Sequence, residues 1–301
     1  MKPHLACNAD LTKVKSSIWG MSKIDGVRGL HITGVFTARS LKPFANINLM
    51  HFDSMLLSWL DGELIIGSDP KSKSLCRDTT SAVTTIEGPS ADKFTWWLFD
   101  YLHPSVRGKP YAVRYTALEN RVELLRAQGF ESLRLVPYKE LHTKEDIEKY
   151  HAENMANGYE GTILRNPEGL YKSGRATAKE ADFLRIKDFI EEEAEVLAIF
   201  EGQANNNEAT TNKLGYTARS SHKENKSPNG MVGSLLCKDL KTGHVITVSA
   251  GALTHLEREF YFKNPEKLVG QIIKYRSMGY GVKDLPRFPT FHSIRAKVDI
   301  S

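Results

Sequence analysis

Residues 23–28, Lys-Ile-Asp-Gly-Val-Arg (KIDGVR), are the stretch from which the fold and the chemistry of this chain can be argued. A lysine amine can attack phosphorus once it loses its proton, but the pKa of a free lysine is about 10.4. We therefore expect nearby cations or a metal to lower the pKa of Lys23. Asp25 could orient the amine or a metal-bound water, Gly26 would let the backbone turn tightly beside a phosphate, and Arg28 could hold a phosphate or ribose oxygen. These residue types also occur in ordinary surface turns, so the rest of the chain has to decide.

Four further motifs follow in order, each at the end of an expected strand. They are DGE at 61–63, FDY at 99–101, EGTILR at 160–165 and RIK at 185–187. Carboxylates there would hold Mg²⁺, which prefers oxygen ligands and substrate phosphates. Cations there would neutralise charge on a transferring phosphoryl group, and an aromatic ring would stack on a purine. Each motif alone is as often structural, but the ordered set predicts a site for nucleotide chemistry.

The composition is that of a soluble globular protein. Of 301 residues, 41 are Lys or Arg and 36 are Asp or Glu, so the formal charge is +5, and 41% of the residues are hydrophobic. These values exclude a disordered chain, and no stretch approaches the roughly 18 apolar residues of a membrane-spanning helix. The N-terminus has no apolar segment typical of a secretory signal. We expect a cytoplasmic protein, or one of the host-cell interior if it is encoded by a virus or phage.

The three cysteines, Cys7, Cys76 and Cys237, lie far apart in the chain. No CxxC pair exists, which argues against a zinc site built on paired cysteines. Reduced thiols in a reducing compartment are therefore expected.

The length predicts two domains, because a single core tends to split above about 250 residues. The acidic run at 189–195 separates two differently textured halves, so the boundary is placed there, giving domains 1–190 and 191–301. The first half mixes strands and helices. Its expected strands are a hairpin at 31–37 turning at Gly34, and 62–66, 96–101, 162–164 and 183–187; its expected helices contain Leu118, Val122 and Leu125 before a stop at Gly129, and run from a cap at Thr143 to Gly158.

The second half is mostly strand-like. Strands are expected at 195–200, 234–240, 245–250 and 271–276, with one helix at 253–262 that presents Leu253, Leu256 and Phe260 on one face. Several short strands and one helix in about 110 residues fit a small barrel of the OB type. The polar stretch 203–229 is too long for a hairpin loop, so it is either disordered or an inserted functional loop.

The ordered set KIDGVR, DGEL, FDYL, EGTILR and LRIK resembles the nucleotidyltransferase motifs of the ATP-dependent DNA ligases. RDTTSAV at 77–83 and YKSGRAT at 171–177 resemble the small viral and phage members of that family. The similarity runs from about Lys2 to the C-terminus. It implies an α+β chain of two domains: an adenylyltransferase (ATP-grasp-like nucleotidyltransferase) domain, 1–190, and an OB-fold barrel, 191–301, with a latch-like DNA-binding loop at 203–229.

The resemblance implies a reaction in three steps. The amine of Lys23 attacks the α-phosphate of ATP and becomes lysyl-AMP, AMP passes to the 5′-phosphate at a nick, and the 3′-OH then displaces AMP. The cofactors implied are ATP and Mg²⁺ (or Mn²⁺), and the partner is nicked duplex DNA bound by a monomer, without a membrane.

Residue roles follow from the same resemblance. The catalytic residues would be Lys23, Asp25 and Lys187. Lys187 would hold the α-phosphate and depress the pKa of Lys23. The residues binding the cofactor would be Arg28, Glu63, Phe99, Glu160, Arg185, Lys187, Arg295 and Lys297, and the metal ligands would be Glu63 and Glu160. The DNA contacts would be Arg39, Thr79, Thr80, Arg175, Lys213, Arg219, Lys223 and Lys226.

Two of these positions depart from the family pattern. Arg185 stands where the family commonly has lysine, and its guanidinium differs in geometry and keeps its proton. The C-terminal region around Arg295 and Lys297 lacks the aspartate of the family's RxDK-like motif, which orients pyrophosphate in the first step. A basic terminal strand is the alternative interpretation there.

Three other functions stay open from the sequence. An mRNA capping guanylyltransferase also uses KxDG and an OB domain, but the DTTSAV stretch and the latch-like insert argue against it. An RNA ligase with a helical C-terminal domain does not fit the strand-rich second half. A non-catalytic OB protein would leave Lys23 unexplained. An NAD⁺-dependent ligase is disfavoured, because 22 residues precede Lys23 and the zinc cysteines of that class are absent.

Overall fold

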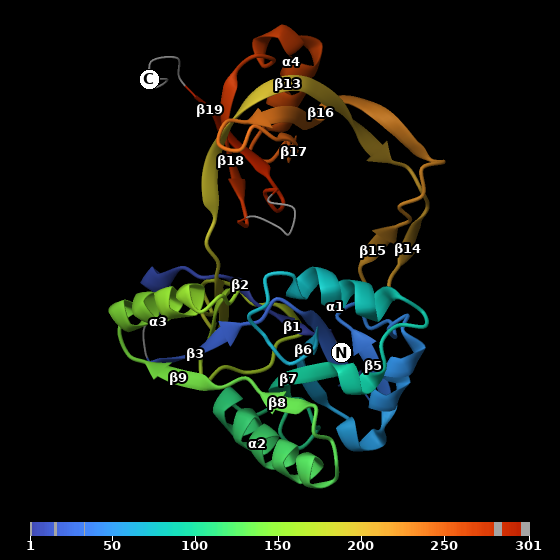
Figure 1. Cartoon of the computed structure of the whole chain (residues 1–301), viewed down its shortest axis with the longest axis vertical. Helices are drawn as coiled ribbons and strands as arrows, with labels where there is room; N and C mark the ends of the chain where they lie inside the picture. The colour runs from blue at the N-terminus through green and yellow to red at the C-terminus, as the bar shows by residue number, and fades with distance from the viewer. Residues whose placement is uncertain (1, 15–16, 33, 280–284, 296–301) are drawn as a thin grey trace. The chain divides into compact units, whose positions relative to one another are not determined.

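The computed structural model describes residues 2–14, 17–32, 34–279 and 285–295 (Figure 1). The chain divides into two compact units, 1–187 and 188–301. The expected boundary was placed at the acidic run 189–195, next to this division. No helix among the described residues is long and apolar enough to cross a membrane.

The first unit is built on two five-stranded sheets. One has the order β5-β4-β6-β7-β8 and the other has the order β2-β12-β10-β3-β9, with β1 and β11 forming a separate pair. The strands of the first sheet are β4 (Val27–Ile32), β5 (Val35–Ala38), β6 (Leu60–Ile66), β7 (Phe94–Tyr101) and β8 (Leu133–Leu135). The remaining strands are β1 (His4–Leu5), β2 (Cys7–Asn8), β3 (Ile18–Lys23), β9 (Tyr138–Leu141), β10 (Gly161–Arg165), β11 (Gly174–Arg175) and β12 (Phe183–Ile186).

The KIDGVR stretch is the connection between the two sheets. Strand β3 ends at Lys23 in one sheet and β4 begins at Val27 in the other. Gly26 lies against the neighbouring strand so closely that a Cβ at this position would overlap the carbonyl oxygen of Leu64. The glycine is therefore required for close backbone approach, although the neighbour is strand β6 and not a phosphate.

Three helices complete the first unit: α1 (Leu75–Thr84), α2 (Tyr111–Ala127) and α3 (Lys144–Ala156). Helix α2 packs on β7 and β8 through buried Leu118, Val122 and Leu125, and Gly129 follows it with φ +95°. Helix α3 begins with a capping box between Thr143 and Asp146. Capping residues and apolar spacing were readable in the sequence, and both predicted helices are confirmed.

The second unit is a closed barrel with the strand order β13-β16-β17-β19-β18, which confirms the predicted OB-type fold. Its elements are β13 (Ile190–Asn205), β16 (Lys226–Asp239), β17 (Val245–Ser249), α4 (His255–Lys263), β18 (Ile272–Ser277) and β19 (Thr290–Ile294). Leu235, Val248, Ile273 and Tyr275 fill the interior. The acidic run is the start of β13, where it pairs with β18, so it is not a simple solvated linker.

The prediction for the barrel helix was wrong about its buried face. Leu256 and Phe260 on α4 are 80% and 51% exposed, whereas Leu253, just before the helix, is buried. Tyr261 and Phe262 pack against the barrel core instead. The helix is thus rotated relative to the face expected from apolar spacing.

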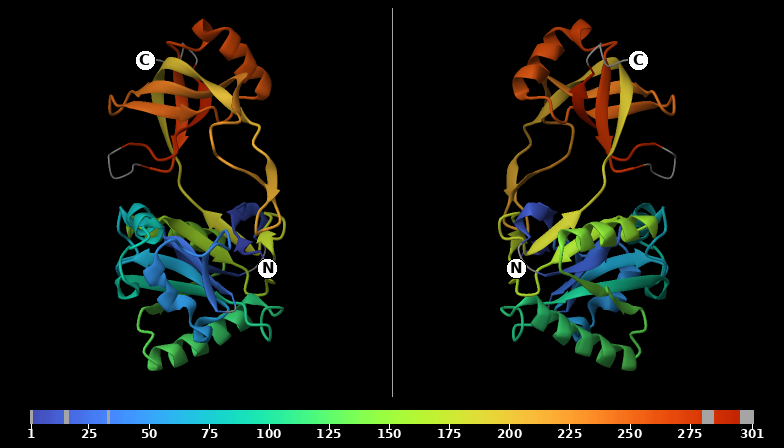
Figure 2. Two further views of the ribbon diagram at one scale, coloured as in Figure 1. Left: turned by 90° about the vertical axis from the view of Figure 1, so that its right-hand side faces the viewer. Right: turned by 90° about the vertical axis from the view of Figure 1, so that its left-hand side faces the viewer.

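The polar stretch 203–229 is an ordered β-ribbon. Strands β13 and β16 continue beyond the barrel and pair as far as Asn205 and Lys226, and β14 (Ala209–Thr211) and β15 (Thr217–Arg219) form a hairpin at the far end (Figures 1 and 2). Inside the ribbon the buried Asn207 side chain donates hydrogen bonds to the carbonyl oxygens of Ser220 and His222. Asparagine hydrogen bonds, invisible to a composition argument, order this segment.

Candidate active site

The first unit contains a pocket of about 530 Å³ at the connection between its two sheets. Seven of the charged residues that line it come from the motifs in the sequence: Lys23, Asp25, Arg28, Glu63, Glu160, Arg185 and Lys187. Lys23, Glu160 and Lys187 come from one sheet and its connections, and Arg28 and Glu63 from the other. The structure therefore brings together residues that are up to 164 positions apart in the sequence (187 − 23).

Glu160 is the central group of the pocket. Its two carboxylate oxygens accept hydrogen bonds from the amines of Lys23 and Lys187, one oxygen each. Backbone pairing fixes this arrangement, because Gly161 lies opposite Lys23 across the β10–β3 pair and the Glu160 amide donates to the Lys23 carbonyl at 3.0 Å. Gly161 has φ +156°, and a Cβ there would overlap the carbonyl oxygen of Ile186.

In the ligand-free protein the pKa of Lys23 is raised, which contradicts the expectation of a lowered value. Burial alone would lower the pKa of this amine, but the carboxylates of Glu160 and Glu63 outweigh burial. Lys187 shares Glu160 with Lys23, so its charge does not release the Lys23 proton. For Glu160, burial alone would raise the pKa, but Lys23 and Lys187 hold it below its usual range. The resting state is thus a lysine–carboxylate–lysine cluster with a protonated amine at position 23.

Glu63 supplies a second carboxylate to the pocket. Burial raises the pKa of Glu63 to about 7, against the opposing effect of Lys23 and Arg28. Among the described residues no cluster of three or more His, Cys, Asp or Glu side chains forms a ready-made metal site. Two partly buried carboxylates still fit Mg²⁺, which in nucleotide sites takes one or two carboxylates and completes its shell with substrate phosphates and water.

Arg28 is positioned differently from the expectation that it binds phosphate. Its guanidinium donates to both oxygens of Asp61, at 2.8 and 2.5 Å, and to the carbonyl oxygen of His4 at 2.6 Å. The same group lies 5.2 Å from the centre of the Phe99 ring. A bidentate pair with a buried aspartate occupies the fork that would bind a phosphate, so the structure contradicts a free phosphate-binding role for Arg28 in this state.

Part of the pocket lining is apolar or aromatic. Met21, Phe99, Tyr111, Val136 and Ile163 belong to this part. Tyr111 donates its hydroxyl to the carbonyl oxygen of Phe99 at 2.7 Å, which fixes the strand that carries the ring. A flat purine can stack on an aromatic ring beside aliphatic side chains of this kind, and stacking on the nucleotide base stays the prediction for Phe99.

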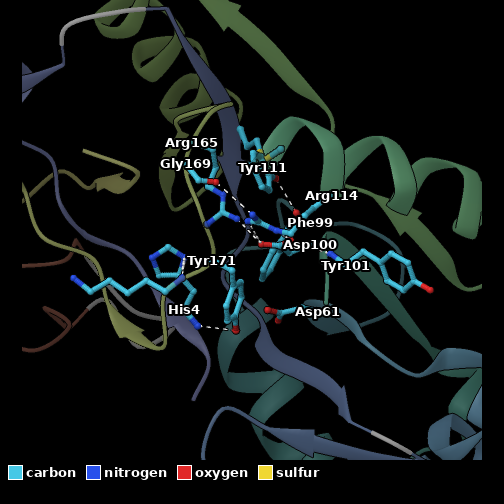
Figure 3. Close-up of polar contacts among 12 residues, drawn as sticks. His4, Asp61, Phe99, Asp100, Tyr101, Tyr111, Arg114, Arg165, Gly169 and Tyr171 are labelled. Atoms are coloured by element: carbon cyan, nitrogen blue, oxygen red, sulfur yellow. Dashed lines mark hydrogen bonds and ion pairs between the residues drawn. The ribbon is translucent and has the colours of Figure 1, made fainter. Parts of the chain in front are cut away.

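A buried charge cluster, which the sequence analysis did not identify, adjoins Phe99 and Tyr111 (Figure 3). Asp100 accepts hydrogen bonds from Arg114, at 2.8 and 3.1 Å, and from Arg165 at 2.5 Å. All three side chains are buried. His4 lies nearby, and burial lowers its pKa to about 3, so its ring is neutral. A signal did exist: Arg114 interrupts the apolar spacing of α2, and Asp100 and Arg165 stand in otherwise apolar strands.

Three expected ligands of phosphate or DNA, Arg39, Arg175 and Arg185, also line the pocket. Arg39 and Arg175 are exposed. Arg175 donates to the carbonyl oxygen of Ala6 at 2.7 Å, and Arg185 donates to the side chain of Asn8 at 2.9 Å. The guanidinium groups of Arg175 and Arg185 therefore contact the N-terminal segment, although both residues line the cavity.

The two threonines expected to contact DNA differ in exposure. Thr79 is fully buried on α1, and its hydroxyl accepts a hydrogen bond from the Ile66 amide at 3.1 Å. The prediction that Thr79 contacts DNA is therefore wrong, because the side chain holds α1 on strand β6. Thr80, the next residue, is exposed.

The described site residues expected in the second unit lie on the ribbon and directly after the last strand. Lys213, Arg219 and Lys223 are exposed and Lys226 is half-buried on the ribbon. Arg295 pairs with Glu193 of the barrel at 2.5 Å. This ion pair with the acidic run was not foreseen, and it competes with a role for Arg295 in binding pyrophosphate. Lys297 lies outside the described residues.

Comparisons with known proteins point in one direction. A family model described as a DNA ligase OB-like domain matches residues 225–295. A structure of a Lig E DNA ligase has a TM-score of 0.73 and 22% identity and covers 98% of this chain and 100% of its own. Chlorella virus DNA ligase-adenylate has a TM-score of 0.54 and 25% identity, covering 98% and 99%. A search of curated protein sequences finds no match.

A further structure also matches over nearly the whole chain. The bacteriophage T7 ATP-dependent DNA ligase, solved in complex with ATP, has a TM-score of 0.51 and 14% identity, with 98% of each chain covered. At these identities the Lig E and T7 likenesses show the fold alone. The chain therefore has the architecture of a small ATP-dependent DNA ligase, with a nucleotidyltransferase unit followed by an OB barrel, and the resemblance stated from the motifs is confirmed.

Proposed function

We propose that this chain is an ATP-dependent DNA ligase that seals nicks between a 3′-OH and a 5′-phosphate in duplex DNA. One observation carries the proposal: Lys23, Glu160 and Lys187 meet in a pocket that also holds Glu63 and Phe99. The pocket stands in a nucleotidyltransferase fold, and an OB barrel follows along the chain. The motif resemblance and the similarity to the Chlorella virus ligase-adenylate support the same function.

In the first step the Lys23 amine attacks the α-phosphorus of ATP. A nitrogen–phosphorus bond forms, the bond from this phosphorus to the pyrophosphate oxygen breaks, and the amine loses its proton. The ligand-free cluster holds that proton, because Glu160 and Glu63 raise the pKa of Lys23. Binding of ATP therefore has to replace the Lys23–Glu160 contact, and Lys187, on the other oxygen of Glu160, is placed to take over a phosphate oxygen.

We further propose that Glu63 and Glu160 hold Mg²⁺ when ATP is bound. Such an ion would supply positive charge beside the triphosphate. Binding of this ion to Glu160 would weaken the ion pair between Glu160 and Lys23 and so favour the neutral form of the Lys23 amine. Asp25 would orient the amine, and Phe99 would stack on adenine.

The later steps require DNA. AMP passes from Lys23 to the 5′-phosphate, and the 3′-OH then attacks that phosphate and releases AMP. The exposed cations Arg39 and Arg175, with Thr80, are the proposed DNA contacts of the first unit. On the second unit the ribbon at 203–229 carries four cations and two carboxylates, a net charge of +2, which suits the DNA backbone.

The deciding experiment is covalent labelling. The chain is incubated with Mg²⁺ and α-labelled ATP, α-labelled GTP or NAD⁺ labelled in its AMP half, then denatured and analysed by mass spectrometry. We expect AMP from ATP on Lys23, and Lys23→Ala should remove it. Lys13→Ala is the control, because Lys13 is an exposed lysine that lies outside the pocket and should not be labelled. Labelling by GTP alone would favour a capping enzyme, and an unlabelled native chain would exclude the ligase.

A second experiment addresses the DNA partner. Removal of residues 203–229 should leave self-adenylylation intact and weaken binding to a nicked duplex. That binding should also fall steeply with salt, because phosphate contacts release counterions. Unchanged nick affinity after the deletion would remove the ribbon from the proposed interface. Preference for an RNA 3′-end over a DNA 3′-end would assign the chain to the RNA ligases.

A further inference from the structure

Three arginines that line the pocket are tied to one short segment near the N-terminus. Arg28 donates to the carbonyl oxygen of His4 at 2.6 Å, Arg175 to that of Ala6 at 2.7 Å, and Arg185 to the side chain of Asn8 at 2.9 Å. Two of the acceptors are backbone carbonyl oxygens, at residues 4 and 6, and the third is the side-chain oxygen of residue 8. The segment at residues 4–8 thus offers the arginines an acceptor at every second residue, and we refer to these three acceptors as the row.

Backbone pairing holds this segment in register with the strands that carry two of the arginines. Strand β1 runs parallel to β11 with Leu5 opposite Arg175, and β2 runs parallel to β12 with Asn8 opposite Arg185. The Ala9 amide donates to the Arg185 carbonyl at 2.9 Å. The row is thus fixed to the strands at both ends and does not depend on the arginine contacts alone.

We propose that residues 4–8 are a positioning element for the guanidinium groups of the active site, and that Asn8 is the positioning residue for Arg185. This inference rests on the proposed function and on the expectation from the motifs that Arg185 binds the nucleotide. An arginine side chain has many rotamers, so an acceptor on its Nε limits its orientation and leaves its terminal nitrogens for the phosphate. Asn8 acts through Arg185 and need not touch the nucleotide.

Asn8 offers a clean test because it is exposed. Asn8→Ala removes the only side-chain acceptor in the row, and its fold should be retained. We expect the ATP concentration for half-maximal labelling of Lys23 to rise about 3- to 10-fold, since a hydrogen bond to a charged group is lost. Arg185→Ala should raise it at least as much. Asp10→Ala is the matched control, because Asp10 follows on the same segment and its side chain caps its own turn through Thr12.

A double-mutant cycle separates positioning from a general structural role. If Asn8 acts through Arg185, Asn8→Ala should add nothing in the Arg185→Ala background. Additive effects, or an Asn8→Ala variant that labels like the wild type while Arg185→Ala is impaired, would overturn the inference. Wild-type affinity in Arg185→Ala would overturn it as well, because there would be no role to position. Loss of all labelling in the wild type would instead refute the proposed function.

Discussion

Replacement of Asp100 by asparagine should destabilise the first unit strongly. Asp100 is the shared acceptor for two buried guanidinium groups, and Arg28 is already paired with Asp61. The five side chains carry three positive and two negative charges, a net of +1, which Asp100→Asn raises to +2. An amide accepts at one atom only, so one arginine would face an NH₂ group. Breaking a buried pair in this way costs about 3–5 kcal/mol.

The sequence provides an optical probe that is specific for this unit. All four tryptophans, Trp19, Trp59, Trp96 and Trp97, precede residue 188, so tryptophan fluorescence reports on unfolding of the first unit without a contribution from the barrel. At about 2–4 °C per kcal/mol for a unit of this size, the melting midpoint should fall by about 6–20 °C. Urea unfolding followed at the same wavelength gives the free energy directly.

The matched control is Asp92→Asn. Asp92 also pairs with a cation, Lys93 at 3.1 Å, but both side chains are about two-thirds exposed, at 67% and 65%. Such surface pairs contribute little to stability, so the melting midpoint should stay close to that of the wild type. If Asp100→Asn cost less than about 1 kcal/mol, the view of this cluster as a structural support for the pocket would be refuted.

Three further outcomes are expected. Gly26→Ala should abolish self-labelling and lower the melting midpoint, because the new Cβ overlaps the Leu64 carbonyl oxygen. Gly108→Ala is the control and should change neither, because a Cβ at that position meets no atom within 4 Å. A fully active Gly26→Ala chain would contradict the close approach of the two strands. Burial alone would raise the pKa of Asp100, but Arg165 and Arg114 hold it below its usual range. The stabilisation is therefore fully present above about pH 3.9 and lost as pH falls through the lowered value. In acid titrations, the stabilities of wild type and Asp100→Asn should begin to approach each other below about pH 3.9 and meet only below the lowered value, and parallel curves would count against the ion pairs. Lys213→Glu, an exposed change at the end of the ribbon, should weaken nick binding several-fold and reduce its salt dependence without changing self-labelling, and equal binding at low salt would argue that DNA does not reach this hairpin.

Much of the pocket was predictable from the sequence because its residues stand at strand ends. Short motifs such as KIDGVR and EGTILR place a charged residue at the end of a strand. Because neighbouring strands end at the same edge of a sheet, these charged residues come to lie close together. Helix limits were predictable for a similar local reason, as the capping box at Thr143 illustrates.

The rest depends on partners far apart in the chain. Nothing near Arg28 in the sequence indicates that Asp61 will take its guanidinium, and only the packing of α1 decides that Thr79 is inside and Thr80 outside. The pKa of Lys23 was misjudged for the same reason. The sequence led us to expect the cation of Lys187 beside the Lys23 amine. The structure instead places the Glu160 carboxylate there, and Lys187 binds the other oxygen of that carboxylate.

The connection at residues 24–26 has a mechanical consequence. It joins the last residue of β3 to the first residue of β4, so four peptide units, reaching at most about 14 Å, separate the nucleophile from the opposite sheet. We therefore expect a relative movement of the two sheets to be transmitted through this short connection to the backbone of Lys23. Substitutions between the two sheets, remote from the cavity, should therefore alter the rate at which the Lys23 amine reacts. A directed-evolution screen for faster self-adenylylation can be expected to select substitutions at positions between the sheets.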